Sequence, residues 1–392
     1  MKVDIEVQYL CTKSLRGIPY YMINLVESLV KRNQNEYTVS FYDYQKERNN
    51  RAYIEEYLAG ALSRNLRMKE CNFLSYKAII EGNENGDTSS YDHIPYNEYF
   101  GEKFDVYHFP HVHNIPRNIV PKTVVTVHDI LPVIPEFAGG WDKKTGTQFN
   151  TSLNFVKQRD DVLIIADSIC TKKDLIEYMD ISSERIHVVP LAYDTQVHYV
   201  DKQPELLSEM GINGPYILYL GVLDFRKGIV NILDAFEILK SKNKDIKLVL
   251  AGELNPVVTP VIERLKGYKY IDDVILTGFV NDEQKRALLS SAEVFLFPSE
   301  YEGFGLPVLE AMACGSPVIT TNVSSLPEVG GDAVMYIPPR HPEALADAIE
   351  KMLYSDILRK EYIDKGFERI KQFSWDKTAE MTEEVYKLAY DR

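Results

Sequence analysis

The sequence predicts a two-domain α/β protein whose sheets consist of parallel strands. Short apolar runs alternate with segments of helical periodicity along the whole chain, which is typical of repeated strand–helix–strand units. The length of 392 residues exceeds what one hydrophobic core usually serves, so we expect two domains.

Apolar runs in the first half of the chain predict strands at residues 2–8, 38–42, 106–109, 123–127, 162–166 and 186–189. These runs are rich in β-branched and aromatic residues, which favour extended structure. Residues 18–31 carry apolar side chains at Tyr21, Leu25 and Leu29, which is the spacing of one helix face. A helix is therefore expected after the first strand, as a parallel connection requires.

The second half repeats this arrangement, with predicted strands at residues 216–220, 247–251, 274–276, 294–297 and 318–320. Helices are predicted between them at residues 229–240 and 282–290, and residues 373–388 predict an amphipathic helix. The connection between the two halves is expected within residues 194–215.

Composition excludes several classes of function. Lys and Arg number 44 against 58 Asp and Glu, and the resulting net charge of −14 disfavours a nucleic-acid binder. No apolar run reaches the roughly 18 residues of a membrane span, and the start of the chain predicts a charged strand rather than a signal peptide. Cys11, Cys71, Cys170 and Cys314 are widely spaced, which favours a reducing cytoplasm and argues against disulfides or a zinc site.

Residues 298–315 carry the most informative pattern of the chain. Glu302 and Glu310 stand eight positions apart, on either side of a turn that contains Gly303 and Gly305. Pro307 suits the first turn of the helix expected next, because that turn does not use its missing N–H. Glycines let backbone N–H groups approach a ligand, and a helix N-terminus favours an anion. The pattern predicts a strand, a glycine loop suited to a diphosphate, and a short helix.

Glu310 falls within an otherwise apolar helix, where an unpaired carboxylate would be costly. A ribose diol is one partner that would satisfy both of its oxygens. The alternative interpretation is a capped surface helix with two incidental acids.

A second pattern runs from Gly221 to Gly228 and includes Arg226 and Lys227, directly after the strand at residues 216–220. Two adjacent cations in an acidic chain predict a phosphate site, because Arg binds phosphate bidentately and Lys adds a point charge. The alternative is a solvated Arg-Lys turn.

Histidines form a third pattern. His128 follows the strand at residues 123–127, where an imidazole could bond a sugar hydroxyl, although a structural histidine is the alternative. His108, His111 and His113 lie close in sequence but lack the acidic or cysteine ligands that usually complete a metal site. No metal is therefore expected there.

The glutamate pattern and the Arg-Lys pattern together resemble the motifs of retaining glycosyltransferases of family four, which have the GT-B fold. That fold has two Rossmann-like domains with parallel sheets that face each other across a cleft, and a C-terminal helix that crosses back to the N-terminal domain. The resemblance implies an acceptor-binding domain at residues 1–200, joined by helix 375–392, and a nucleotide-sugar-binding domain at residues 208–374.

The resemblance also implies a role for individual residues. It places Glu302 beside the donor sugar, Glu310 on the ribose, Arg226 and Lys227 on the diphosphate, and His128 against the donor sugar. Glu302, His128, Arg226 and Lys227 then form the catalytic set. The other donor-binding residues are Gly303, Phe304, Gly305, Leu306, Gly221, Gly278 and Gly17.

The chain departs from the family near its first loop, where Arg16 replaces a glycine that relatives carry before Gly17. A second departure is Ala192, where many relatives have glycine. Residues 45–100 match no known motif, and within them residues 62–69 form a cationic stretch. We expect a solvated helix face there, with peripheral contact to the anionic inner membrane surface or to a lipid-diphosphate acceptor as the alternatives.

The implied reaction is transfer of a hexose from a nucleotide diphosphate sugar to a saccharide or lipid-linked acceptor in polysaccharide synthesis. The segment from His128 to Pro132 most resembles bacterial mannosyltransferase-like members that act on surface polysaccharide, which favours GDP-mannose, with a UDP-hexose as the rival donor. The chain contains no DxD triplet, so we expect a metal-independent enzyme without a cofactor. A catalytically inactive GT-B accessory subunit is the alternative.

Overall fold

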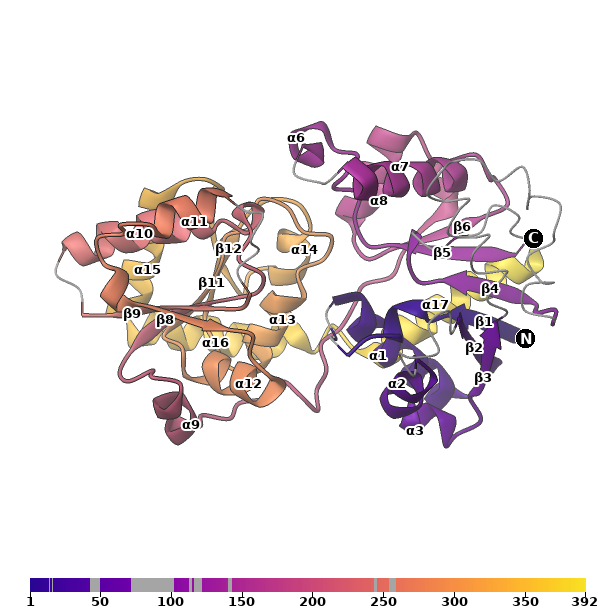
Figure 1. Ribbon diagram of the computed structural model, residues 1–392, viewed down its shortest axis with the longest axis horizontal. Coiled ribbons are helices and arrows are strands. Elements are labelled where there is room, and N and C mark those ends of the chain that lie inside the picture. The colour runs from indigo at the N-terminus through magenta and orange to yellow at the C-terminus, as the bar shows by residue number, and fades with distance from the viewer. Residues whose placement is uncertain are drawn as a thin grey trace. The chain divides into compact units, whose positions relative to one another are not determined.

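The computed structural model describes residues 1–13, 15, 17–42, 50–71, 102–112, 115, 122–139, 143–242, 245–253 and 259–392. Arg16 and His113 lie outside this part of the chain. The structure divides into two compact units, the first formed by Met1–Leu191 with Trp375–Arg392 and the second by Ala192–Ser374. Each unit is built on one parallel sheet (Figure 1).

The sheet of the first unit has the strand order β3-β2-β1-β4-β5-β6-β7, and every neighbouring pair is parallel. Strands β4 and β5 are buried along their whole length, as expected for strands covered on both faces. The strands are β1 (Lys2–Glu6), β2 (Glu36–Tyr42), β3 (Arg67–Cys71), β4 (Val106–Phe109), β5 (Thr123–Val127), β6 (Leu163–Ala166) and β7 (Ile186–Val188).

Helices of the first unit connect these strands. They are α1 (Gly17–Arg32), α2 (Asn50–Tyr57), α3 (Ala59–Leu62), α6 (Pro135–Ala138), α7 (Lys143–Lys157), α8 (Ile169–Met179) and α17 (Trp375–Asp391).

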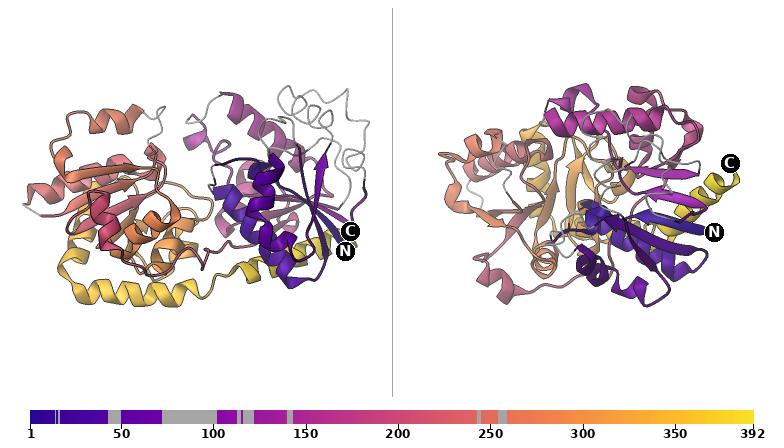
Figure 2. Two further views of the ribbon diagram at one scale, coloured as in Figure 1. Left: turned by 60° about the horizontal axis from the view of Figure 1, so that its bottom comes forward. Right: turned by 45° about the vertical axis from the view of Figure 1, so that its right-hand side comes forward.

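Helix α17 comes from the C-terminal end of the chain and packs against α1 and strands β4 to β6 of the first unit (Figure 2). Its apolar face includes Ala379 and Val385, both buried. Arg32 at the end of α1 binds Glu383 of α17, with 2.9 Å between Nε and Oε2. The amphipathic helix expected near the C-terminus is thus confirmed, together with its return to the N-terminal unit.

The sheet of the second unit has the order β10-β9-β8-β11-β12-β13, again with parallel neighbours. Helices α10 and α11 lie on one side of it and α12 and α13 on the other (Figure 1). The strands are β8 (Tyr216–Leu220), β9 (Lys247–Ala251), β10 (Val274–Gly278), β11 (Val294–Phe297), β12 (Val318–Thr321) and β13 (Met335–Ile337). The helices are α9 (Pro204–Glu209), α10 (Ile229–Ser241), α11 (Thr259–Leu265), α12 (Asp282–Ser291), α13 (Leu306–Ala313), α14 (Leu326–Gly330), α15 (Pro342–Tyr354) and α16 (Asp356–Ile370).

Both sheets reverse their strand order once, between β1 and β4 in the first unit and between β8 and β11 in the second. Ligands of open parallel sheets bind beyond the carboxyl ends of the strands at such a reversal. The loop that follows β8 contains the Arg-Lys pattern, and the loop that follows β11 contains Glu302, the first residue of the glutamate pattern. The topology therefore brings these two patterns together.

Two features differ from the sequence predictions. Strands β3 and β13 lie at sheet edges and were not expected from their sequences. The prediction of a solvated helix face at residues 62–69 is wrong, because α3 ends at Leu62 and β3 begins at Arg67. Arg67 and Lys69 in β3 pair with Glu102, at 3.6 and 3.3 Å. Among the described residues, no helix is both long and apolar enough to cross a bilayer.

Candidate functional site

The loops that follow β8 and β11 are held against each other in the second unit. The backbone N–H of Glu300 donates to the carbonyl oxygen of Arg226 at 2.9 Å. Gly228 has a φ of 72°, and a Cβ there would lie 2.3 Å from the carbonyl oxygen of Pro298. Only glycine therefore fits this close approach without moving the backbone. The two loops form one structural element in which Arg226, Lys227 and Glu302 are neighbours.

Lys227 and Glu302 form an ion pair, with 2.7 Å between Nζ and Oε1. The side chain of Lys227 is 29% exposed and that of Glu302 is 12% exposed. The pair thus joins the two patterns that the sequence had singled out separately. It places an ammonium group and a carboxylate side by side at the carboxyl ends of β8 and β11.

Arg226 is oriented by Asp224, a residue whose role the sequence analysis missed. The guanidinium binds the carboxylate twice, at 2.9 Å through one terminal nitrogen and at 3.2 Å through Nε. Burial opposes the charge on Asp224, but the hydrogen bonds from Arg226 outweigh it and lower the pKa of Asp224. A carboxylate two positions before a cation is common in turns, so the spacing alone could not reveal this contact.

Two serines hold the glycine loop that precedes α13. The N–H of Glu302 donates to Ser324 Oγ at 3.0 Å. Ser325 Oγ lies 2.9 Å from the carbonyl oxygen of Glu302 and 2.6 Å from that of Phe304. Gly305 opens α13 with a φ of 112°, in the region that favours glycine. The first-turn N–H groups of a helix have no intrahelical acceptor, so Gly305 and Leu306 begin an element suited to an anion.

Glu310 projects from α13 and lies beside a lysine and a histidine from distant parts of the second unit, of which the lysine is its ion-pair partner. Lys285 of α12 lies 2.7 Å from Oε2, and His198 Nε2 lies 3.6 Å from Oε1. Burial opposes ionisation of Glu310, but the charge of Lys285 outweighs it and lowers the pKa of Glu310. The carboxylate is therefore ionised and already paired. No sequence motif connects Lys285 or His198 to Glu310, so these two neighbours could not be predicted from the sequence.

Glycines meet at the carboxyl ends of β8 to β10. Gly221 has a φ of 147° and Gly278 a φ of 68°. The N–H of Gly252 donates to the carbonyl oxygen of Gly278 at 2.9 Å, and a Cβ on Gly252 would lie 1.9 Å from the carbonyl oxygen of Gly221. Next to them, Phe279 is 65% exposed. This edge of the sheet exposes backbone groups and the ring of Phe279, and the loops that carry Arg226, Lys227 and Glu302 follow the neighbouring strands.

His128 lies in the first unit, directly after β5. Its Nδ1 lies 2.6 Å from Asp167 Oδ2, and its Nε2 lies 2.9 Å from the carbonyl oxygen of Pro110. A carbonyl and a carboxylate both accept, so both ring nitrogens donate and the imidazole is a cation. Burial disfavours that charge, but Asp167 outweighs burial and raises the pKa of His128. His128 must give up one of these bonds to donate to a sugar, and its contact with the donor stays a prediction.

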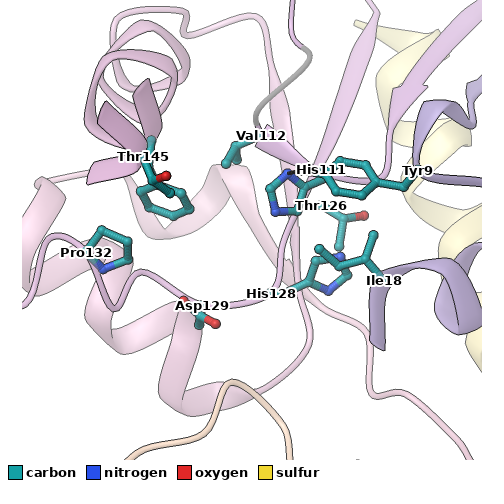
Figure 3. Close-up of a pocket in the computed structure, with 10 residues that line it drawn as sticks. Tyr9, Ile18, His111, Val112, Thr126, His128, Asp129, Pro132 and Thr145 are labelled. Atoms are coloured by element: carbon teal, nitrogen blue, oxygen red, sulfur yellow. Dashed lines mark hydrogen bonds between the residues drawn. The ribbon is translucent and has the colours of Figure 1, made fainter. Parts of the chain in front are cut away.

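A cavity of about 290 Å³ lies beside His128, at the carboxyl ends of β1, β4 and β5 (Figure 3). Two aromatic rings line the cavity from different elements: Tyr9 follows β1, and Phe149 belongs to α7. Gly17 opens α1 just before Ile18, which also contributes to the wall. The other lining residues are His111, Val112, Thr126, Asp129, Pro132 and Thr145.

His108 is part of the core rather than of this cavity. It bonds Tyr386 of α17 at 2.7 Å and Thr126 at 2.8 Å, and burial lowers its pKa to about 3. Within the described residues, no group of three or more His, Cys, Asp or Glu side chains is placed to hold a metal ion.

Much of this chain is similar in sequence to known proteins. Residues 205–369 match the family described as glycosyl transferases group 1. The O-antigen chain mannosyltransferase B of Escherichia coli is 32% identical over 295 residues, which cover 72% of this chain and 74% of that protein. The serotype-specific mannosyltransferase WbdA of Escherichia coli is 29% identical over 281 residues, but these cover only 34% of its length.

Among solved structures, HepE of Anabaena in complex with UDP and glucose superimposes with a TM-score of 0.69. The alignment covers 99% of this chain and 100% of that protein, at 16% identity. At this identity the likeness concerns the fold. It confirms the expected arrangement of two α/β units with parallel sheets.

Proposed function

The chain belongs to the glycosyl transferases group 1 family, and we propose that it transfers a hexose from a nucleotide diphosphate sugar to a saccharide or lipid-linked acceptor. One observation carries this proposal more than any other. Arg226, Lys227, Glu302 and the start of α13 converge at the carboxyl ends of β8 and β11, where the strand order reverses.

Each part of this convergence fits one part of the donor. A diphosphate requires positive charge and N–H donors, which Arg226, Lys227 and the first turn of α13 supply. Glu310 is ionised and accepts hydrogen bonds, as a ribose ligand must. The exposed edge around Gly278 and Phe279 suits a nucleobase, which can stack on a ring and bond to backbone.

The reaction we propose places its main electrostatic demand on the leaving group. Negative charge grows on the departing phosphate oxygen as the bond to the sugar breaks, and Arg226 and Lys227 stabilise that charge. Glu302 carries the opposite charge next to Lys227 and stabilises the positive charge that develops on the sugar. Because cationic side chains act as the neutralising groups, we propose that the transfer needs no metal ion. We propose retention of configuration on a different ground, the resemblance of the glutamate pattern to that of retaining glycosyltransferases of family four.

The cavity beside His128 is the acceptor site in this proposal. Tyr9 and Phe149 offer flat apolar surface to the C–H faces of a sugar, while Asp129 and Thr145 offer hydrogen-bond acceptors for its hydroxyls. A neutral saccharide suits this lining better than a second diphosphate, because no Lys or Arg contributes to the described wall.

For the donor we propose GDP-mannose, with a UDP-hexose as the second candidate. Two relatives in Escherichia coli are named as mannosyltransferases, one of them for the O-antigen chain. The structure of HepE contains UDP and glucose, which keeps a UDP-hexose as the alternative. The O-antigen relative also supports a place in polysaccharide synthesis.

A panel of nucleotide sugars tests the proposal. Hydrolysis and thermal stabilisation are measured for wild type, Lys227→Met and Lys242→Met. Lys242 also pairs with a glutamate, Glu350, at 2.6 Å, but in another part of the second unit. We expect Lys227→Met to lower kcat/KM at least about 30-fold, or about 2 kcal/mol, and Lys242→Met to match wild type. Binding without turnover for every donor and acceptor tried would favour an inactive accessory subunit instead.

A further inference from the structure

His198 is a buried histidine whose second nitrogen faces Glu310. Its side chain is 6% exposed, in the segment between β7 and α9. Nδ1 lies 3.2 Å from the carbonyl oxygen of Asp194. Nε2 lies 3.6 Å from Glu310 Oε1, which is too long for a hydrogen bond, and no other group among the described residues bonds it.

The contact with Asp194 determines which ring nitrogen carries the proton. A backbone carbonyl only accepts, so Nδ1 must donate to it. Burial lowers the pKa of His198 despite the nearby charge of Glu310, so the ring is neutral at pH 7. In a neutral ring with Nδ1 protonated, Nε2 carries a lone pair and can only accept.

Two acceptors therefore face each other without a donor between them. Glu310 is ionised and also only accepts, and its other oxygen is already bound by Lys285 at 2.7 Å. A buried acceptor without a donor costs free energy, so this pair of acceptors favours a ligand that donates to both. Hydroxyl donors directed at Oε1 and Nε2 together satisfy both acceptors. A vicinal diol does this, because its two hydroxyls lie close enough together to donate to two neighbouring acceptors.

We infer that His198 is a second ribose ligand, which accepts one hydroxyl of the nucleotide diol at Nε2 while Glu310 accepts the other at Oε1. The inference rests on the proposed function, since it extends the role proposed for Glu310. Lys285 has a different task, because its bond to Oε2 keeps Glu310 ionised and turns Oε1 toward the histidine. His198 thus makes the site selective for ribonucleotides over deoxyribonucleotides.

Calorimetry with nucleotide analogues tests the inference. The probes are ADP, GDP, CDP and UDP, and then the 2′-deoxy and 3′-deoxy forms of the tightest binder. Wild type is expected to bind the ribonucleotide at least about tenfold more tightly than either deoxy form. His198→Phe keeps a ring of similar size but removes the acceptor. It should weaken ribonucleotide binding about tenfold and leave one deoxy form within about twofold of wild type.

His198→Gln is the matched variant. Its amide oxygen can lie where Nε2 lies, so it should recover most of the affinity that His198→Phe loses. A measurement on wild type avoids any folding defect in the variants. The ¹⁵N resonance of Nε2 should have the position of an unprotonated ring nitrogen and shift toward that of a hydrogen-bonded one when the nucleotide binds. An Nε2 that is protonated, or that does not respond to the nucleotide, would overturn the inference.

Comparison with Glu310→Gln separates failure of this inference from failure of the proposed function. If Glu310→Gln loses the preference for ribose but His198→Phe keeps it, the inference about His198 is wrong and the proposed function stands. If wild type itself does not distinguish ribose from deoxyribose, the ribose role of Glu310 is wrong as well. If none of the four ribonucleotides binds, the proposed function is overturned.

Discussion

Replacement of Lys285 by methionine tests how Glu310 is kept charged inside α13. The two side chains are 16% and 15% exposed and lie 2.7 Å apart. Methionine fills a similar volume but leaves the carboxylate without its cation. His198 cannot take over, because its Nε2 is 3.6 Å away and carries no proton when the ring is neutral.

The size of the effect follows from the burial of the pair. Removal of one partner from a fully buried pair costs about 3–5 kcal/mol, and loss of an exposed pair costs about 0–1 kcal/mol. The pair is mostly but not completely buried, so Lys285→Met should lose about 2–3 kcal/mol. The double variant with Glu310→Gln should lose less than the single one, because no uncompensated charge remains.

The assay must report on the second unit alone, since two units need not unfold together. Hydrogen exchange of the amides in β11 and β12, followed as urea rises, gives the free energy of opening for that unit. Lys242→Met is the control, because the Lys242–Glu350 pair is 43% and 27% exposed. It should lose less than about 1 kcal/mol.

The pH dependence of stability gives a second criterion, because the contribution of Glu310 should change in opposite directions with pH in wild type and in Lys285→Met. In wild type the pKa of Glu310 is lowered by folding, so its contribution to stability is present above the unfolded pKa and is lost as pH falls through the folded pKa. Without Lys285, burial raises the pKa instead, and stability should then rise as pH falls through that higher value. The reasoning is refuted if Lys285→Met costs no more than Lys242→Met and keeps the pH dependence of wild type.

Three further predictions concern the reaction and the first unit. In steady-state kinetics, Glu310→Gln should mainly raise the donor KM, because ribose is bound in ground and transition states alike. Glu302→Gln should mainly lower kcat. Equal effects of the two variants on KM alone would contradict this division of roles. Activity should survive EDTA, and restoration by Mg²⁺ or Mn²⁺ after complete loss would disprove a metal-independent site. Asp167→Asn should lower the pKa of His128, measured by NMR titration of its ring protons. In wild type this pair stabilises the first unit below the ordinary histidine pKa, and that contribution is lost as pH rises through the raised value, so a flatter pH profile is expected for Asp167→Asn.

The strands that the sequence predicted best are those buried in the middle of a sheet. Residues 106–109, 123–127, 216–220, 247–251 and 294–297 form strands with the predicted bounds. Their runs are largely apolar because both faces are covered, although His108, Thr126 and Lys247 interrupt three of them. Edge strand β3 contains Arg67, Lys69 and Glu70, so no apolar run marks it. Its strand geometry comes from pairing with β2, which sequence reading cannot detect.

In the candidate site, too, the sequence predicted what depends on local pattern and missed what depends on contacts between distant segments. Glu302 and Glu310 are eight positions apart on one loop and helix, so local pattern was enough to identify them. Lys285 and His198 come from other elements, and only folding brings them to Glu310. The sequence showed that a carboxylate in an apolar helix needed a partner, but it could not show that a lysine already supplies part of that need.

The membership of α17 in the first unit has a consequence for how the chain folds during synthesis. Strands β1 to β7 leave the ribosome long before Trp375–Arg392, which belong to the same unit. At 5–20 residues per second, synthesis of residues 192–374 takes roughly 10–40 s. Throughout that interval the surface that later receives Tyr386 and Ala389 has no helix to cover it. The second unit is continuous in sequence and can complete its own core first, so the N-terminal unit is the later of the two to reach its final packing.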